Sequence, residues 1–204
     1  RWLRKHALGD RHLDRTWWAP GSRGWWIAIL FAIGSTLFAL GALAPYADAV
    51  GATRTAVTFF VGSLFFTSAA FLQYREAVDG LPRALDGSRR TRMWVWAPGQ
   101  LGWSACAVQL VGTVWFNLST GYAIHPGLTA AQADARIWRP DALGSVAFLV
   151  ASTLAWVECC QGWWAWRPRS LPWRITVANL VGSFAFAISA VASYVVPATG
   201  SLRN

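Results

Sequence analysis

The sequence predicts an all-α integral membrane protein: a five-transmembrane-helix bundle, N-terminus in and C-terminus out, with an internal helix-hairpin repeat. Three observations predict this class. Apolar residues come in blocks of membrane-spanning length, basic residues gather on one side of those blocks, and one short motif recurs in every block. Charged residues make up only 13% of the chain, against about 25% in an ordinary soluble domain.

Each block approaches the roughly 20 residues that cross a hydrocarbon core as a helix. The five predicted spans are about 25–44, 55–73, 101–122, 142–157 and 175–196. The first stops at Pro45, the second at the charged run from Tyr74 to Glu76, and the fifth at Pro197. The fourth is the shortest and can begin near Ile137.

The spans divide the chain into six segments. They are a basic cytoplasmic arm (1–23), a first helical hairpin (24–74), a cytoplasmic Arg/Trp-rich loop (75–100), a second helical hairpin (101–158), a cytoplasmic Trp/Arg-rich loop (159–174), and the fifth transmembrane helix with a short outer tail (175–204).

The distribution of Lys and Arg predicts the orientation, because loops rich in these residues stay in the cytoplasm. Fourteen of the 18 basic residues lie on the arm 1–23 and the loops 75–100 and 159–174. The remaining four, on the opposite side, are Arg54, Arg136, Arg139 and Arg203. We therefore expect a multi-pass protein of a bacterial inner membrane with a cytoplasmic N-terminus.

Tryptophan shows the same asymmetry. All but two of the 15 Trp residues lie at or near the predicted cytoplasmic side; the exceptions are Trp115, within a span, and Trp138, at the outer face. Indole favours the headgroup region, so one interpretation is an aromatic belt whose neighbouring arginines bind anionic lipid. The alternative is a docking surface for another protein. The candidate partner or lipid surface comprises Glu158, Trp163, Trp164, Trp166, Arg167 and Arg169.

The repeated motif is Gly-[Ser/Thr]-x-x-Phe, and it occurs once in each span. Its glycines and phenylalanines are Gly34 and Phe38, Gly62 and Phe66, Gly112 and Phe116, Gly144 and Phe148, and Gly182 and Phe186. Seven positions after each glycine stands a small residue: Gly41, Ala69, Ser119, Ala151 and Ser189. Five copies at fixed spacing predict an internal repeat.

The spacing of this motif predicts helix packing, because positions i, i+4 and i+7 share one helix face. Glycine lets a neighbouring backbone approach, and such close contacts hold helices together in lipid, where hydrophobicity supplies no drive for association. A ligand groove lined by the same residues is the alternative.

The first two spans, with Trp25-Trp26-Ile27, Gly34-Ser35 and the run from Phe60 to Phe66, resemble the YrhK-like domain, a two-helix bacterial membrane module. Spans three and four resemble a second, diverged copy, and span five resembles an unpaired first half. The resemblance covers most of the membrane part and implies a helical-hairpin fold, with no assigned activity or catalytic residues.

The chain has few residues suited to catalysis or metal binding. We therefore expect that the protein is not an enzyme and that it binds no cofactor and no metal ion. No ionisable residue lies near the middle of a predicted span, and no span holds a histidine, which argues against a proton relay or haem ligation. Cys159 and Cys160 are adjacent, a poor arrangement for chelation. Glu158 is expected at headgroup level, paired with Arg167 or Arg169.

Neutral polar residues remain inside the spans, mainly Gln109, Asn117 and Asn179. Their amides need hydrogen-bond partners in hydrocarbon, so they should face the bundle interior. We expect interhelical hydrogen bonds there; a small polar site or water path between spans three and five is the alternative.

These observations predict a non-enzymatic accessory or scaffold subunit of a larger membrane assembly, or a self-associating bundle. The expected partners are anionic membrane lipids and other membrane-protein subunits or further copies of the chain, and no nucleic acid. The alternative is a small transporter or channel for a neutral or hydrophobic solute, with its path near Gln109, Asn117 and Asn179. A lipid-handling enzyme would need a nucleophile or metal site that the sequence does not offer.

Overall fold

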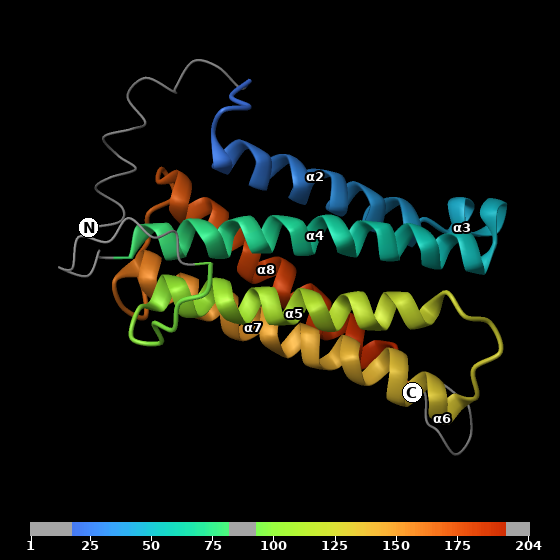
Figure 1. Ribbon diagram of the computed structural model, residues 1–204. Helices are drawn as coiled ribbons and strands as arrows, with labels where there is room; N and C mark the ends of the chain where they lie inside the picture. Colours follow the sequence, from blue (N-terminus) through green and yellow to red (C-terminus); the bar gives the residue numbers. More distant parts are fainter. Residues whose placement is uncertain (1–17, 82–92, 195–204) are drawn as a thin grey trace.

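The computed structural model describes residues 18–81 and 93–194, and these ranges contain helices and no strand (Figure 1). The helices are α2 (Arg23–Ala42), α3 (Ala44–Val50), α4 (Ala52–Gly80), α5 (Leu101–Ala123), α6 (Ala130–Ala133), the π-helical segment η1 (Asp134–Trp138), α7 (Arg139–Cys160) and α8 (Leu171–Ala192). The predicted all-α class is confirmed.

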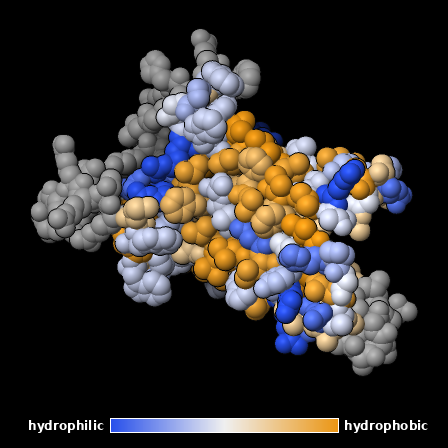
Figure 2. Space-filling view, turned by 45° about the vertical axis from the view of Figure 1, so that its right-hand side comes forward, coloured by the Kyte–Doolittle hydropathy of each residue, from blue (hydrophilic) through white to orange (hydrophobic). Residues whose placement is uncertain are grey.

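Five helices in the described part of the chain are long and apolar enough to cross a membrane: α2, α4, α5, the continuous run 130–160 that ends in α7, and α8. This agrees with the five predicted spans and indicates a multi-pass membrane protein. Figure 2 shows hydrophobic residues over most of the middle of one face and hydrophilic residues mainly toward the ends.

The helix ends differ from the predicted ones for local reasons. Pro45 does not end the first span but stands in the first turn of α3, where a missing N–H costs nothing. Gly51 separates α3 from α4 with φ 82°, a conformation that favours glycine. Helix α4 continues seven residues beyond Gln73 to Gly80, because the charged run after the span is itself helical.

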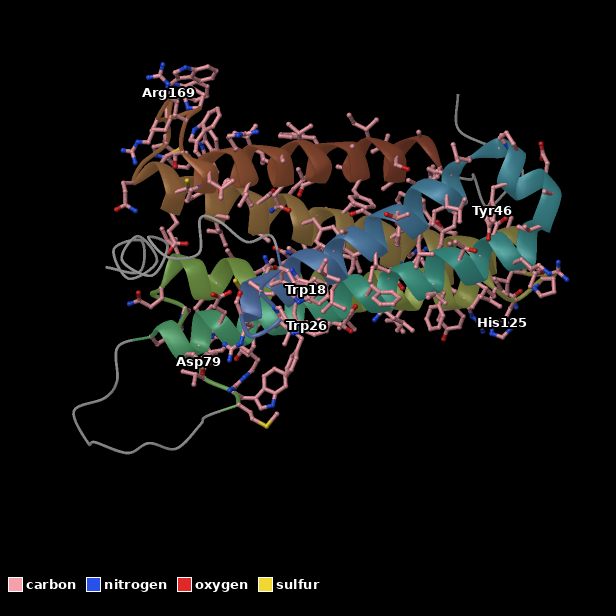
Figure 3. The ribbon with its side chains drawn as sticks, turned by 90° about the horizontal axis from the view of Figure 1, so that it is seen from above. Trp18, Trp26, Tyr46, Asp79, His125 and Arg169 are labelled. Carbon is pink, nitrogen blue, oxygen red and sulfur yellow. The ribbon has the colours of Figure 1, made fainter. Side chains whose placement is uncertain are left out.

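The five long helices pack in chain order: α2 against α4, α4 against α5, α5 against α7, and α7 against α8. Phe38 of α2 also reaches Phe186 of α8, with ring centroids 6.2 Å apart. Figure 3 shows α2 crossing α4 obliquely. The ends of the bundle can be followed there, with Asp79 and Arg169 toward one end and Tyr46 and His125 at the other.

Small residues form most of the buried contacts between these helices. The most deeply buried include Ala69, Ala70, Ala151 and Ser152, each with at most 1% of its surface exposed. Large apolar residues such as Val111 and Val181 lie outside and are more than half exposed. A small-residue interior with an apolar exterior is the arrangement expected of helices associating in lipid.

Candidate functional site

Glycine and phenylalanine interlock reciprocally where α2 meets α4. A Cβ added to Gly34 would lie 3.0 Å from the Phe66 ring, and one added to Gly62 would lie 2.7 Å from the Phe38 ring. Each ring therefore fills the space left by the glycine of the other helix.

The second pair of helices, α5 and α7, repeats this contact. A Cβ on Gly112 would lie 2.9 Å from the Phe148 ring, and one on Gly144 would overlap the Phe116 ring. The backbones also approach closely, since the Gly112 carbonyl oxygen would lie 3.1 Å from the Gly144 Cβ. At these four positions the structure uses glycine for close helix approach, as the motif predicts.

The fifth glycine differs. Apart from the adjacent residues and nearby backbone of α8 itself, no heavy atom of the described residues lies within 4 Å of a Cβ added to Gly182. Its partner in the motif, Phe186, does pack inside the bundle, with its ring centroid 5.1 Å from that of Phe116 and 5.8 Å from that of Phe148. Helix α8 thus contributes the Phe186 ring to the centre of the bundle, but in the described residues no second helix packs against its motif glycine, Gly182.

The five motif rings meet in one place, which we call the phenylalanine cluster: Phe38, Phe66, Phe116, Phe148 and Phe186. Together with Ser63 and Thr113 they surround a cavity of about 10 Å³. That volume is close to the smallest that holds one water molecule. The cluster therefore closes the centre of the bundle to anything larger.

The predicted polar residues of α5 face α4. Gln109 Nε2 donates to Gln73 Oε1 at 3.2 Å, and Asn117 Nδ2 donates to Thr67 Oγ1 at 2.9 Å. Asn117 Oδ1 is buried and has no partner among the described residues. The two amides thus join α5 to α4.

Asn179 stands apart from Gln109 and Asn117. It is exposed on α8, and its side chain has no hydrogen-bond partner among the described residues, while its backbone carbonyl accepts from Ser183 Oγ at 2.9 Å. The structure therefore does not assemble the three amides into a polar site between α5 and α8. An unpaired amide in the middle of an apolar helix is costly in hydrocarbon.

A larger cavity, of about 400 Å³, lies near the ends of α3, α4 and α5. Its lining is mainly alanine, with Phe59 and the hydroxyl residues Thr55, Ser119 and Thr120. It is open, and in the described part of the chain no ionisable residue lines it. Its size and lining suit a small apolar molecule.

A second repeat, which the sequence reasoning missed, precedes three of the helices. It reads Trp-x-Pro-x-[Ser/Gln]-x-x-Trp, and we call it the Trp-turn motif. Its copies are Trp18–Trp25 before α2, Trp96–Trp103 before α5, and Trp166–Trp173 before α8. Nine residues after its last Trp comes the motif glycine of each helix: Gly34, Gly112 and Gly182. This constant spacing was the signal that could have revealed it.

The three Trp-turn motifs have the same structure. Each Pro lies in a turn closed by a backbone hydrogen bond of 2.9, 3.0 or 2.9 Å, donated by Ser22, Gln100 or Ser170. The two indoles of each copy meet edge to face, with centroids 5.1, 5.5 and 5.2 Å apart and interplanar angles of 73°, 74° and 73°. Such aromatic pairs add about 0.5–1.5 kcal/mol beyond area burial, so each turn is held against its helix.

An aromatic residue at the end of the preceding helix supports two of these motifs. Tyr74 of α4 packs against Trp94 and Trp103, with centroids 5.6 and 6.1 Å away. Trp156 of α7 packs in the same way against Trp164 and Trp173, at 5.8 and 6.0 Å. Both loops are therefore fixed to the bundle by ring contacts.

Hydrogen bonds reinforce this attachment. The Tyr74 hydroxyl donates to the Val95 carbonyl and accepts from the Val95 N–H, both at 3.3 Å. Trp173 Nε1 donates to the Ala165 carbonyl at 2.7 Å, and Trp156 Nε1 to the Trp163 carbonyl at 2.9 Å. The loops 93–100 and 161–170 have defined backbones as a result.

These loops hold their outermost indoles away from the bundle. The residues are Trp94, Trp96, Trp163, Trp164 and Trp166, which we call the tryptophan surface. Their exposed fractions run from 69% to 83%. Arg167 and Arg169, in the same loop, are exposed as well.

Glu158 does not pair with Arg167 or Arg169 in the described part of the chain; the ion pairs found there are Arg23–Asp79, Arg75–Asp79 and Arg139–Asp134. Its carboxylate instead covers the start of α5, where a Cβ added to Gly102 would lie 2.8 Å from both oxygens. A carboxylate there is stabilised by the free N–H groups and dipole of the helix.

Among residues 18–81 and 93–194, no group of three or more His, Cys, Asp or Glu side chains is placed to hold a metal ion. Cys106, Cys159 and Cys160 are free. Comparison with protein-family models, with curated proteins and with solved structures finds no match. The resemblance to the YrhK-like domain therefore stays a prediction.

Proposed function

We propose that the protein is a non-enzymatic subunit of a membrane assembly and that it binds a partner protein through the tryptophan surface. The observation that carries this proposal is the pair of structured loops holding Trp96 and Trp163 more than 80% exposed. Exposed, rigidly held tryptophans are typical anchors of protein interfaces.

The construction of the loops favours a partner protein over a lipid belt alone. A belt needs only indoles at headgroup depth, whereas here ring contacts and hydrogen bonds from Tyr74 and Trp156 set the position of each loop. A preorganised surface loses little entropy on binding. The nearby exposed Arg167 and Arg169 suit an acidic rim on the partner.

We propose a bacterial inner membrane as its location, with the tryptophan surface in the cytoplasm. The excess of Lys and Arg on the arm and the two Trp-rich loops supports this orientation. Anionic lipid headgroups at that face would add to the attraction.

The alternative function, passage of a small neutral or hydrophobic solute, has one supporting observation, the cavity of about 400 Å³ between α3, α4 and α5. The phenylalanine cluster argues against a path through the bundle, because only about 10 Å³ remains open among its rings. Binding of an apolar molecule in the cavity, without passage, fits both observations.

The test replaces Trp163, Trp164 and Trp166 together by leucine and isolates the protein in mild detergent from its own membranes. Leucine keeps the side chains apolar, so insertion should persist while the shaped contact is lost. We expect co-purifying subunits to be lost from this variant. Circular dichroism should stay unchanged and thermal unfolding should fall only slightly, because Trp164 and Trp166 also contact Trp156 and Trp173.

The matched control replaces Phe184, 54% exposed on α8, by leucine, which should retain the subunits. Retention of every subunit by the triple tryptophan variant would refute the proposal. It would leave the lipid belt as the role of these residues.

A further inference from the structure

Helices α2, α5 and α8 are equivalent in sequence and in local structure. Each follows a Trp-turn motif, and each carries Gly-[Ser/Thr]-x-x-Phe at the same distance from that motif. Equivalent helices should make equivalent contacts, so the neighbours of α5 predict the neighbours of α2 and α8.

Helix α5 has two neighbours, one on each side. Its Gly112 face meets α7 through Phe148. Its Thr113 face meets α4: Thr113 is buried, and its carbonyl oxygen lies 3.5 Å from Thr67 Oγ1, which donates to the Ser63 carbonyl at 3.0 Å. The glycine and the adjacent hydroxyl residue therefore point to different helices.

Helix α8 rests on α7 as α5 rests on α4. The hydroxyl of Ser63 on α4 bonds Thr120 Oγ1 of α5 at 3.0 Å, and the equivalent Ser145 on α7 donates to the Phe186 carbonyl of α8 at 3.4 Å. Ser183 is buried like Thr113. Helix α7 thus occupies the side of α8 that corresponds to the α4 side of α5.

The other side of α8 has no counterpart of α7 in the described residues. At Gly34 and Gly112 an added Cβ would meet a phenylalanine ring at 3.0 and 2.9 Å, whereas at Gly182 it would meet no atom within 4 Å. Asn179, less than one turn away, is exposed, and its side chain has no partner among the described residues. This side therefore has a glycine contact position and an amide that both lack a neighbour.

Helix α2 lacks the complementary neighbour. Ser35 corresponds to the buried Thr113 and Ser183, but it is exposed. One helix lying between α8 and α2 would meet Gly182 on one side and Ser35 on the other. It would give α2, α5 and α8 the same two kinds of neighbour.

The contact between Phe38 and Phe186 is compatible with such a helix. Phe116 and Phe186 lie 5.1 Å apart although α7 packs between α5 and α8. Phe38 and Phe186, 6.2 Å apart, can likewise meet at the centre while another helix packs outside them.

We propose that this position binds a transmembrane helix of a partner protein, antiparallel to α8 and carrying Gly-[Ser/Thr]-x-x-Phe. This partner is inferred from the two helices that fill the equivalent position, α4 beside α2 and α7 beside α5, because both are antiparallel to their neighbour and carry this motif. This position is separate from the tryptophan surface, so the proposal for one can be refuted while the proposal for the other holds.

A second copy of the chain fits less well. Its α4 and α7 already interlock with its own α2 and α5. Its α8 would run parallel to the first in one membrane, and that orientation does not reproduce the reciprocal contact seen twice within the chain.

The test measures energy transfer in liposomes between the donor-labelled full chain and an acceptor-labelled peptide with the α7 sequence, residues 139–160. The decisive variant is Gly182→Phe, whose ring would fill the proposed contact. The matched control is Val191→Phe, since Val191 is 74% exposed and lies nine positions further on, on the opposite side of the helix.

We expect the peptide to bind the unaltered chain and the Val191→Phe control. Gly182→Phe should weaken binding by about tenfold or more, since close helix approach drives association in lipid. A peptide with Phe148→Ala should bind the unaltered chain more weakly as well.

Three results would overturn the proposal. One is the absence of energy transfer with the unaltered chain. Another is equal binding by Gly182→Phe, which would indicate exchange with the chain's own α7. The third is energy transfer between two labelled copies, without peptide, that Gly182→Phe abolishes, because the occupant would then be a second copy.

Discussion

The glycine contacts make a quantitative prediction about two substitutions of the same kind. Gly144→Ala would place a methyl group in overlap with Phe116 Cδ2 and 3.1 Å from the Gly112 carbonyl oxygen. The ring can turn, but the carbonyl belongs to the backbone of α5 and can yield only if the two helices separate. Gly182→Ala would place the same group where the described residues leave at least 4 Å free.

The magnitude follows from comparing the two variants. Alanine favours a helix over glycine by about 1 kcal/mol, and this gain applies to both, so it cancels in the difference. Overpacking a close contact costs about 1–3 kcal/mol. We therefore expect Gly144→Ala to have a free energy of unfolding about 1–3 kcal/mol below that of Gly182→Ala.

The assay is reversible unfolding in mixed micelles with increasing SDS, followed by tryptophan fluorescence and circular dichroism. Gly182→Ala should unfold at or above the SDS fraction of the unaltered protein, and Gly144→Ala clearly below it. Equal midpoints for the two variants would refute the claim that these glycines differ because one is in a helix contact and the other is not.

Two further predictions concern hydrogen bonds between helices. Thr67→Val should lower the free energy of unfolding by about 1 kcal/mol and more than Asn117→Leu does, because it removes the partner of Asn117 Nδ2 while the buried Oδ1 already has none among the described residues. The SDS assay compares the two variants, and a larger loss for Asn117→Leu would contradict this reasoning. Trp138→Phe should loosen α8 from α7 by about 0.6 kcal/mol, because Trp138 Nε1 donates to the Ala190 carbonyl at 2.7 Å; hydrogen exchange at the end of α8 should quicken, and unchanged exchange would speak against the bond.

The helices were predictable because their signals are local. Blocks of apolar residues of membrane-spanning length follow from the thickness of the bilayer, and five such helices are present in the described residues. The placement of Gly34, Gly62, Gly112 and Gly144 at helix contacts also follows from local spacing, since a residue four positions on shares a helix face.

Which helices meet was less predictable. Gln109 and Asn117 were expected to need partners, and they have them, but on α4 rather than α8. Nothing in the sequence of α5 says which neighbour an amide faces. Asn179 was expected inside the bundle and is exposed, because the side of α8 near Gly182 has no neighbour in the described residues.

The Trp-turn motif was missed for a different reason. The aromatic-belt interpretation depends only on the membrane depth of these tryptophans and not on their spacing within each loop. The constant interval between Trp25, Trp103 or Trp173 and the next motif glycine is visible in the sequence. Only the structure shows that the three turns and ring pairs have one geometry.

The proposal that the protein is a subunit of a larger assembly is tested most directly by native mass spectrometry of the unaltered protein, released gently from its own membranes. We expect a reproducible complex that contains this chain and a second, different membrane polypeptide. A bare monomer under conditions that preserve known complexes of the same membranes would contradict it.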